Sequence, residues 1–272
     1  MISFVGSGPG AADLLTLRAV DRLARADVIV WAGSIVSPEV LEHGNPEAVV
    51  VDSSGLTLEQ ITDVFEKWSH AAIVRLQSGD PSVYGAIAEQ IDWCVANERD
   101  FEIVPGVSSV SAAAAAARRE LTVPGLAQSV VLTRLASRTA ASMPDRESVA
   151  AFAALGPTMA LFLSAARPDE LQAQLTSIGS AYDADTPAVL AHRVSWPEER
   201  IVDTTVGDLA SSLRDLGVTT TVLVLVGEAL RPVSAGGAAE DRSAADGRRR
   251  SHVYDGTYAH SHRGADSAEG SG

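Results

Sequence analysis

The chain has 272 residues, 46% of them hydrophobic and 21% charged, an ordinary composition for a globular protein of one or two domains. Its net charge of −14 disfavours nucleic acid and anionic membrane surfaces as partners. The single cysteine, Cys94, excludes an intrachain disulfide and a cysteine metal cluster. With no apparent signal peptide and no apolar run of about 20 residues, we expect a soluble, cytoplasmic protein.

The first half of the chain alternates apolar, β-branched runs with helical patterns. Five runs are expected to form strands, at residues 2–5, 27–31, 48–52, 72–76 and 101–104. The expected helices cover 14–26, a segment opened by a Thr57–Gln60 capping box, a segment ending near Asn97, and the alanine-rich stretch after residue 109. This alternation predicts a parallel, doubly wound α/β sheet with helices on both faces. Ligands of such sheets bind beyond the carboxyl ends of the strands.

The second half has a different pattern and predicts a mixed α/β sheet. Its expected strands are 129–134, 158–163, 187–193, 200–206 and 220–227, with helices between only some of them. The third and fourth of these strands, joined through Trp196-Pro197, are expected to form a hairpin. We therefore predict an N-terminal domain at 1–116 and a C-terminal domain at 117–232. Residues 233–272 have almost no aliphatic side chains and are expected to be a disordered tail.

Glycine-bearing loops follow the first, fourth and fifth predicted strands, with G-S-G-P-G at 6–10, G-D-P at 79–81 and P-G-V-S-S at 105–109. Taken singly, each is explained at least as well by a strand-to-helix turn, and Asp80 by a helix N-cap. Taken together, they lie on one edge of one sheet and predict a pocket lined by backbone amides, hydroxyls and one carboxylate. Such a pocket suits a small, zwitterionic, nucleoside-like ligand.

Other chemistries have little support in the sequence. The first loop has G-x-G-x-G spacing rather than G-x-G-x-x-G, and the second strand ends at Trp31 instead of an acidic ribose ligand, which disfavours a nicotinamide cofactor. Lys67 is the only lysine, so there is no P-loop. The histidine and cysteine spacing does not match a zinc site, and no metal is expected. Cys94 lies in an apolar helical pattern and is predicted to be in the core.

At the three loops the sequence resembles the tetrapyrrole methylases. That family has G-x-G-P-G after the first strand, G-D-P after the fourth and P-G-[VI]-x-[AS] after the fifth, and all three motifs occur here in this order. The resemblance covers residues 1–230 and is greatest to the branch that methylates C-11 of precorrin-4. It rests on RLQSGDPSVYGAI at 75–87 and on the segments 32–36, 119–124 and 128–134. One departure is that Ala11-Ala12 stand where the family pattern has Asp-Pro.

The resemblance implies an S-adenosylmethionine-dependent enzyme of two α/β domains, with the active site in the cleft between them, and a homodimer. The implied reaction methylates C-11 of precorrin-4 and gives precorrin-5 in cobalamin biosynthesis. The implied cofactor contacts are Pro9, Gly79, Asp80, Val83, Ser108, Ser109, Leu163, Ser164, His192 and Thr221. The candidate contacts of the tetrapyrrole substrate are Gly8 and four arginines that would offset its carboxylates, Arg118, Arg119, Arg134 and Arg138.

No protein nucleophile is expected, because an electron-rich macrocycle supplies the attacking carbon. Catalysis then rests on holding the reacting atoms close and collinear, which contributes up to about 7–11 kcal/mol. The sequence does not identify the base that takes the proton. Three alternatives stay open at this point. They are another tetrapyrrole methylase (acting on cobalt-precorrin-4 or precorrin-2, or at C-20 or C-17), a nicotinamide-dependent oxidoreductase, and a non-catalytic ligand-binding module.

Overall fold

The computed structural model describes residues 1–136, 140–144, 146–232 and 251–254. Within this part of the chain there are ten strands and seven α-helices. The strands are β1 (Ile2–Gly6), β2 (Val28–Trp31), β3 (Val49–Asp52), β4 (Ile73–Gln77), β5 (Phe101–Val104), β6 (Val130–Arg134), β7 (Thr158–Phe162), β8 (Pro187–His192), β9 (Arg200–Thr205) and β10 (Val222–Val226). The helices are α1 (Leu17–Ala24), α2 (Leu58–Lys67), α3 (Ala88–Ala96), α4 (Ser109–Ala116), α5 (Val149–Ala153), α6 (Pro168–Leu175) and α7 (Leu209–Leu216). All ten predicted strands are confirmed.

The chain divides into two compact units. The first consists of residues 1–118, 190–202 and 216–223, and the second holds the rest of the described chain. An α/β fold with one parallel and one mixed sheet confirms the predicted fold class. The domain boundaries predicted at 116/117 and 232/233 stay predictions. Among the described helices, none combines the length and the apolar character that a bilayer crossing needs.

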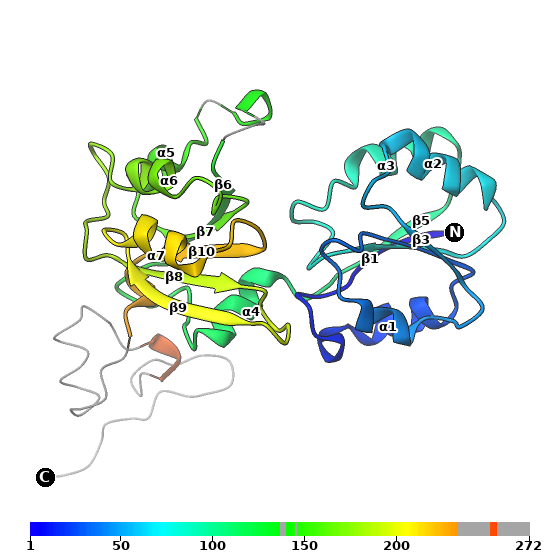
Figure 1. Ribbon diagram of the computed structural model, residues 1–272, viewed down its shortest axis with the longest axis horizontal. Coiled ribbons are helices and arrows are strands. Elements are labelled where there is room, and N and C mark those ends of the chain that lie inside the picture. The colour runs from blue at the N-terminus through cyan, green and yellow to red at the C-terminus, as the bar shows by residue number, and fades with distance from the viewer. Residues whose placement is uncertain (137–139, 145, 233–250, 255–272) are drawn as a thin grey trace, which may run out of the picture. The chain divides into compact units, whose positions relative to one another are not determined.

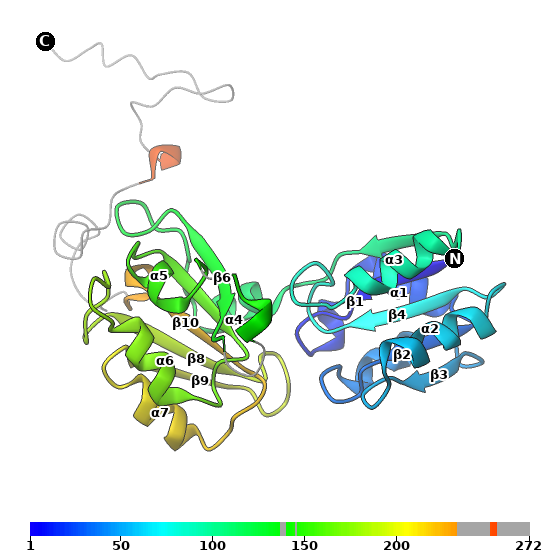
Figure 2. The same ribbon diagram turned by 90° about the horizontal axis from the view of Figure 1, so that it is seen from above.

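The first sheet has five parallel strands in the order β3-β2-β4-β1-β5. β1 lies between β4 and β5, with Val5 opposite both Leu76 and Val104. Helices cover both faces of this sheet, α2 and α3 on one face and α1 on the other (Figure 1), and the strands lie side by side in Figure 2. The doubly wound arrangement is confirmed, and it places the carboxyl ends of β1, β4 and β5 next to one another.

Both faces of the first sheet are apolar, because successive residues of a strand point to opposite faces. On the face of α1, Val5 packs in one cluster with Leu23. On the face of α2 and α3, Phe4 packs with Phe65 and Cys94, and the two phenylalanine rings meet edge to face with centroids 6.5 Å apart. Cys94 is fully buried, which confirms its predicted place in the core.

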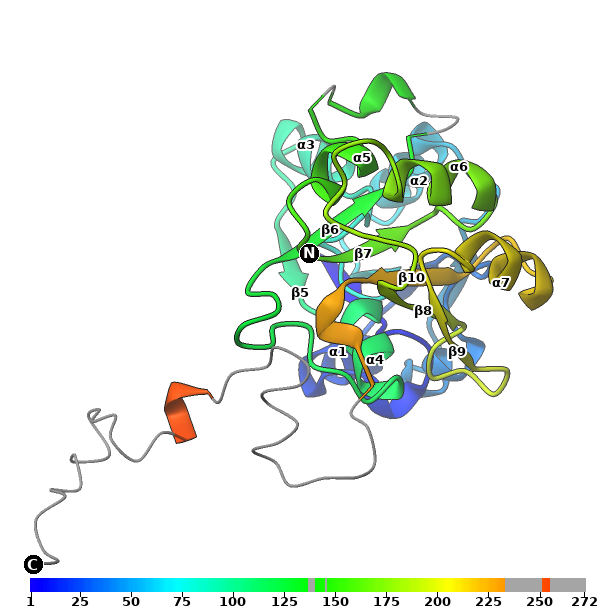
Figure 3. The same ribbon diagram turned by 90° about the vertical axis from the view of Figure 1, so that its left-hand side faces the viewer.

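The second sheet has the order β6-β7-β10-β8-β9 (Figure 3). β6 and β7 are parallel, whereas β7 and β10 are antiparallel, so the sheet is mixed as predicted. β8 and β9 are neighbours in it, as expected for the two segments joined through residues 193–199. Helices α5 and α6 lie against each other. Gln172 of α6 donates to the carbonyl of Gly207, which precedes α7, at 2.9 Å, and accepts from the amide of Ala210 in α7 at 2.8 Å.

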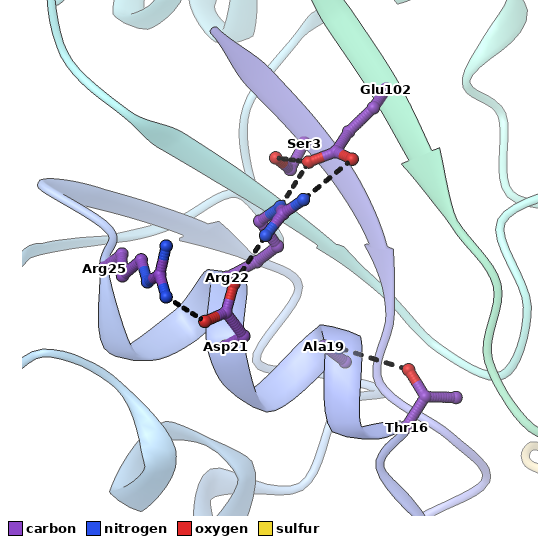
Figure 4. A network of polar contacts seen from close by, with 7 residues as sticks. All are labelled: Ser3, Thr16, Ala19, Asp21, Arg22, Arg25 and Glu102. Carbon is purple, nitrogen blue, oxygen red and sulfur yellow. Dashed lines mark hydrogen bonds and ion pairs between the residues drawn. The ribbon is translucent and has the colours of Figure 1, made fainter.

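Hydroxyl caps fix where α1 and α2 of the first unit begin. Thr57 and Gln60 form the predicted capping box at α2. At α1 the Thr16 hydroxyl accepts from the amide of Ala19 at 3.1 Å (Figure 4). This cap starts α1 at Leu17, so the helix is shorter than the predicted segment 14–26.

Two predictions fall wholly or largely on residues that the structure does not describe. Arg138 lies outside the described residues, as does most of the predicted tail. The four tail residues that are described, 251–254, include a 3-10 turn at His252–Tyr254. The disorder expected for 233–272 stays a prediction.

Candidate functional site

The loops after β1, β4 and β5 meet at the carboxyl edge of the first sheet. Gly8 and Gly79 form an isolated antiparallel bridge, with 3.2 Å from the nitrogen of Gly8 to the oxygen of Gly79 and 2.8 Å in the reverse direction. Asp80 accepts a hydrogen bond from the amide of Gly106 at 2.9 Å. The three sequence motifs, which are far apart along the chain, are therefore brought together as predicted.

Backbone-to-backbone packing at this edge requires glycine. A Cβ added at Gly106 would lie 2.2 Å from the oxygen of Gly79 and 2.8 Å from the Cα of Gly6. Gly8 and Gly79 also adopt left-handed φ angles of +73° and +65°. The glycines of the three motifs thus allow the loops to approach one another.

Asp80 lies in the loop after β4, where it bonds to the loop after β5, and not at the start of a helix. Its Oδ1 accepts from the amide of Ser82 at 2.8 Å, while its Oδ2 accepts from Gly106. The alternative interpretation of Asp80 as a helix N-cap is wrong, because α3 begins only at Ala88 and has Ile87 as its N-cap. A carboxylate has about four lone-pair sites, so Asp80 retains acceptor capacity for a ligand.

The start of α4 packs against the loop after β4. Ser108 is the N-cap of α4 and its hydroxyl accepts from the amide of Val110 at 3.3 Å, so the strand-to-helix turn given as the alternative interpretation of this motif does occur here. A Cβ added at Gly79 would lie 3.7 Å from the nitrogen of Ser109, in ordinary contact. The cofactor candidates that the structure brings together at this edge are Gly79, Asp80, Val83, Ser108 and Ser109.

The connection between β8 and β9, residues 193–199, lies against the loop after β1. Trp196 Nε1 donates to the carbonyl oxygen of Pro9 at 2.9 Å, and the Ser195 hydroxyl accepts from the amide of Ala11 at 3.0 Å. The carbonyl of Pro9, a cofactor candidate, is therefore already bonded within the protein. Sequence reasoning treated Trp196 only as a hairpin residue. The presence of a large aromatic side chain in so short a connection was the one sign in the sequence that this residue contacts another part of the protein.

His192 and Thr221, two further cofactor candidates, lie near each other at neighbouring strands, since the next amide, that of Arg193, donates to the carbonyl of Thr221 at 3.0 Å. His192 is 7% exposed, and within the described residues its Nδ1 is buried without a hydrogen-bond partner. Burial lowers the pKa of His192, and the nearby Arg200 and Arg193 lower it further. Thr221 is exposed at a left-handed φ of +57°, a strained conformation often found at functional sites.

The other two cofactor candidates follow β7, in the second unit. The hydroxyl of Ser164 is buried, accepts from the amide of Leu135 at 2.9 Å and donates to the carbonyl of Phe162 at 2.7 Å. Ser164 thus joins the ends of β6 and β7. Leu163 instead has a left-handed φ of +52° and is 75% exposed.

Two substrate candidates lie in the first unit. Gly8 uses its N–H in the bridge to Gly79, so this donor is already committed within the protein. Arg118 follows the C-cap of α4, Ala117, has a left-handed φ of +56° and is exposed.

Arg119 and Arg134 belong to the second unit. Arg119 donates from Nε to the carbonyl of Leu230 at 2.7 Å and pairs with Asp203 at 3.2 Å, and its side chain is only 13% exposed. Arg134 is half-buried and donates to the hydroxyl of Ser142 at 2.8 Å. Arg119 therefore has a clear structural role, whereas Arg134 lies nearer the surface.

Arg75 is a buried charge to which sequence reasoning gave no role. It donates from Nε to the side-chain oxygen of Gln90 at 3.2 Å and from Nη1 to the hydroxyl of Ser53 at 3.0 Å. Gln90 in turn donates to the carbonyl of Ala86 at 2.9 Å. Burial lowers the pKa of Arg75 to about 10, which leaves it protonated at neutral pH. The signal was a single arginine inside an otherwise apolar strand.

The chain is a two-sheet α/β protein, with one doubly wound parallel sheet and one mixed sheet. Its glycine loops meet at the carboxyl edge of the parallel sheet, which is the edge where proteins of this class bind their ligands. The family model for tetrapyrrole (corrin/porphyrin) methylases matches residues 1–210, and the chain belongs to this family. The resemblance predicted from the three loops is confirmed.

Similar proteins include enzymes from more than one branch of this family. The precorrin-4 C(11)-methyltransferase of Sinorhizobium sp is 41% identical over 231 residues, which are 84% of this chain and 90% of that protein. A solved structure of a cobalt precorrin-4 methyltransferase, a cobalamin biosynthetic enzyme, has a TM-score of 0.81 at 39% identity, over 85% of this chain and 96% of that one. The uroporphyrin-III C-methyltransferase of Thermus thermophilus, solved with S-adenyl homocysteine, has a TM-score of 0.71 at 27% identity, over 85% of this chain and 98% of that one.

Proposed function

We propose that the chain transfers the methyl group of S-adenosylmethionine to C-11 of precorrin-4 and gives precorrin-5, a step of cobalamin biosynthesis. The observation that supports this most is the 41% identity to the Sinorhizobium precorrin-4 C(11)-methyltransferase over 90% of that protein's length. Identity to the uroporphyrin-III enzyme is lower, at 27%, which favours the C-11 branch of the family.

The loops of the first unit fit a nucleoside-like, zwitterionic cofactor. The carboxylate of Asp80 retains acceptor capacity, the first turn of α4 lies against Gly79, and Thr221 is exposed. S-Adenosylmethionine would supply a methyl group bonded to a positively charged sulfur. The residues of this unit that we propose to hold it are Pro9, Gly79, Asp80, Val83, Ser108, Ser109, His192 and Thr221. Leu163 and Ser164 are further candidates.

In this proposal the residues of the chain bind and orient, and none of them attacks. A carbon–carbon bond forms at C-11, the carbon–sulfur bond breaks with its electron pair passing to sulfur, and a proton leaves the macrocycle. The rate then depends on alignment of the reacting atoms. The mutual packing of Gly6, Gly79 and Gly106 supports such alignment, because it fixes the backbone of the loops.

The substrate carries carboxylates and the chain has a net charge of −14, so local cations are needed. We propose Arg118 and Arg134 for this role, with Arg119 contributing from its bonded position. Arg134→Gln is expected to raise the KM for the tetrapyrrole about tenfold, the usual effect of one charge-assisted hydrogen bond, with the KM for S-adenosylmethionine unchanged. Arg214→Gln, at an exposed ion pair, is the control. An unchanged tetrapyrrole KM after Arg119 and Arg134 are replaced together would contradict this role.

We also propose that the protein acts as a homodimer in the cytoplasm, as the family resemblance implies. Light scattering on the purified full chain tests the assembly, and a mass of one protomer would contradict it.

The decisive experiment incubates the full chain with precorrin-4 and S-adenosylmethionine carrying a ¹³C-labelled methyl group. Mass spectrometry is expected to show one added methyl group, nuclear magnetic resonance to place the label at C-11, and S-adenosylhomocysteine to form in equal amount. Precorrin-2 is the matched substrate for the alternative within the family. A label at another carbon, or no product from either tetrapyrrole, would contradict the proposal.

A second candidate is the same reaction on cobalt-precorrin-4. The 0.81 TM-score to the cobalt precorrin-4 methyltransferase favours it. A parallel assay with the cobalt-containing substrate separates the two through kcat/KM. Calorimetry with S-adenosylhomocysteine and with NADH tests the nicotinamide-dependent alternative, and heat of binding only with NADH would favour that class.

A further inference from the structure

The β8–β9 connection binds the first loop on both sides of Gly10. On one side Trp196 donates to the carbonyl of Pro9, and on the other the Ser195 hydroxyl accepts from the amide of Ala11. Between them the indole covers Gly10 so closely that an added Cβ would lie 2.2 Å from Trp196 Cδ1. Two hydrogen bonds and one close contact therefore fix three consecutive residues of the loop.

The connection is itself held in a defined shape. Arg193 lies over the Trp196 ring, 5.3 Å from its centroid, and the carboxylate of Glu199 accepts from the amide of Ser195 at 2.6 Å. Arg193 and Ser195 both have left-handed φ angles, +45° and +65°, which are unfavourable for residues with a Cβ. Such strain persists only where the surroundings impose it, and it occurs most often at functional sites.

The first loop lacks a side-chain anchor of its own at this point. Ala11 is the N-cap of the 3-10 turn Ala12–Leu14 and makes no side-chain cap hydrogen bond. The alanine side chain has no oxygen with which to cap such a turn. The anchor for Ala11 comes instead from Ser195, 184 residues further along the chain.

We propose that Trp196 and Ser195 are positioning residues, which hold the loop of residues 8–11 in the conformation that binds the methyl donor. They act through the backbone of Pro9 and Ala11 and do not themselves react. This inference rests on the proposed function, because it takes S-adenosylmethionine as the ligand of that loop.

Replacement of Ser195 separates positioning from stability. Ser195→Gly and Ser195→Ala both remove the acceptor for Ala11, but glycine also relieves the left-handed strain. We expect Ser195→Gly to melt at the same temperature as the wild type or higher and still to bind S-adenosylhomocysteine about fivefold more weakly in calorimetry, the effect of one lost hydrogen bond. Replacement of a residue with only a structural role would not weaken binding while leaving the melting temperature unchanged or raised.

A second set of variants tests the contact of the indole. Trp196→Phe keeps an aromatic ring and removes the donor to Pro9, so we again expect about fivefold weaker binding. Gly10→Ala should weaken binding alone but much less in a Trp196→Ala background, where the obstructing ring is absent. Trp68→Phe is the matched control, because Trp68 also has a cation, Lys67, over its ring, 5.9 Å from the centroid.

The outcomes distinguish this inference from the function on which it rests. If the wild type does not bind S-adenosylhomocysteine, the proposed function and the positioning role both fail. If the wild type binds it, and Ser195→Gly and Trp196→Phe bind it within about twofold of the wild type, only the positioning role is overturned. Weaker binding by both variants, with Trp68→Phe unchanged, supports it.

Discussion

The carboxylate of Asp80 and the amide of Gly106 form a 2.9 Å hydrogen bond that ties the loop after β4 to the loop after β5. The same carboxylate also accepts from the amide of Ser82, so one side chain orders two loops. Each of its oxygens is used as an acceptor from the backbone. A side chain of the same size that lacks the second acceptor oxygen could therefore not make both of the hydrogen bonds of Asp80.

Asp80→Asn is expected to destabilise the protein, because asparagine has one acceptor oxygen and its NH2 group cannot accept from the second backbone N–H. The loss should be about 1.5 kcal/mol, the lower end for a hydrogen bond to a charged group. Urea unfolding measures it, and affinity for S-adenosylhomocysteine should fall as well. Asp92→Asn, on the exposed surface of α3, is the control. Equal unfolding midpoints for the two variants would show that the Asp80 bonds contribute nothing.

Gly106→Ala is expected to destabilise the first unit by about 1–3 kcal/mol, since its Cβ would collide with the backbone of Gly79 and of Gly6. Gly55→Ala is a matched control, because a Cβ there has no heavy atom within 4 Å. Thermal unfolding should separate the two variants clearly. If both melt alike, the close packing of the loops does not exist in solution.

A polar network near the start of β1 predicts a dependence of stability on pH (Figure 4). Arg22 of α1 donates to both oxygens of Glu102 on β5, at 2.5 and 3.3 Å, and the hydroxyl of Ser3 donates to the same carboxylate at 2.8 Å. These bonds lower the pKa of Glu102, and the hydrogen bond from Arg22 has the largest effect. The stability that Glu102 contributes to the fold is therefore complete above the unfolded-state pKa, near 4.5. It is lost as the pH falls through the lower folded-state pKa.

Glu102→Gln should consequently lower stability at neutral pH by about 1 kcal/mol or less, as for other partly exposed pairs, and flatten the profile below pH 4.5. Urea unfolding at a series of pH values measures this, with Glu66→Gln on the surface of α2 as the control. A Glu102→Gln profile that parallels the wild type down to low pH would contradict the argument.

His192 predicts a second dependence on pH. Burial and two arginines lower its pKa below the ordinary 6.5, so protonation favours the unfolded chain. The contribution of His192 to stability is full above pH 6.5 and declines as the pH falls toward the folded-state pKa. A nuclear magnetic resonance titration should give His192 a midpoint below 6.5. Its resonance is assigned by its loss in His192→Gln, with His70→Gln as the control, and a midpoint above 6.5 would contradict the observed burial.

Local patterns were enough to predict the strands, the capping box at Thr57 and the convergence of three loops. Each of these depends on residues close in sequence or on the general rule that parallel strands end at one edge. The role of Asp80 could not be predicted in the same way. Its partner Gly106 lies on another loop, and the start of α3 at Ala88 depends on how the chain packs after β4.

The contact of Trp196 with Pro9 was beyond the sequence for a similar reason. The two residues are 187 positions apart, and the hydrophobic pattern of a hairpin does not reveal what the hairpin touches. Arg75 shows a further limit. A buried guanidinium with neutral partners such as Gln90 and Ser53 departs from the expectation that buried charges are paired.

The backbone contact between Gly6 and Gly106 has a consequence for the order in which the protein folds. The two glycines are 100 positions apart, and β1 must pair with β5 before they can touch. Contacts with such large sequence separation form late, because the chain entropy lost in closing the loop precedes any gain. A nascent chain that ended before β5 would therefore contain the loops after β1 and β4 but not the loop after β5, which packs against them through Gly106.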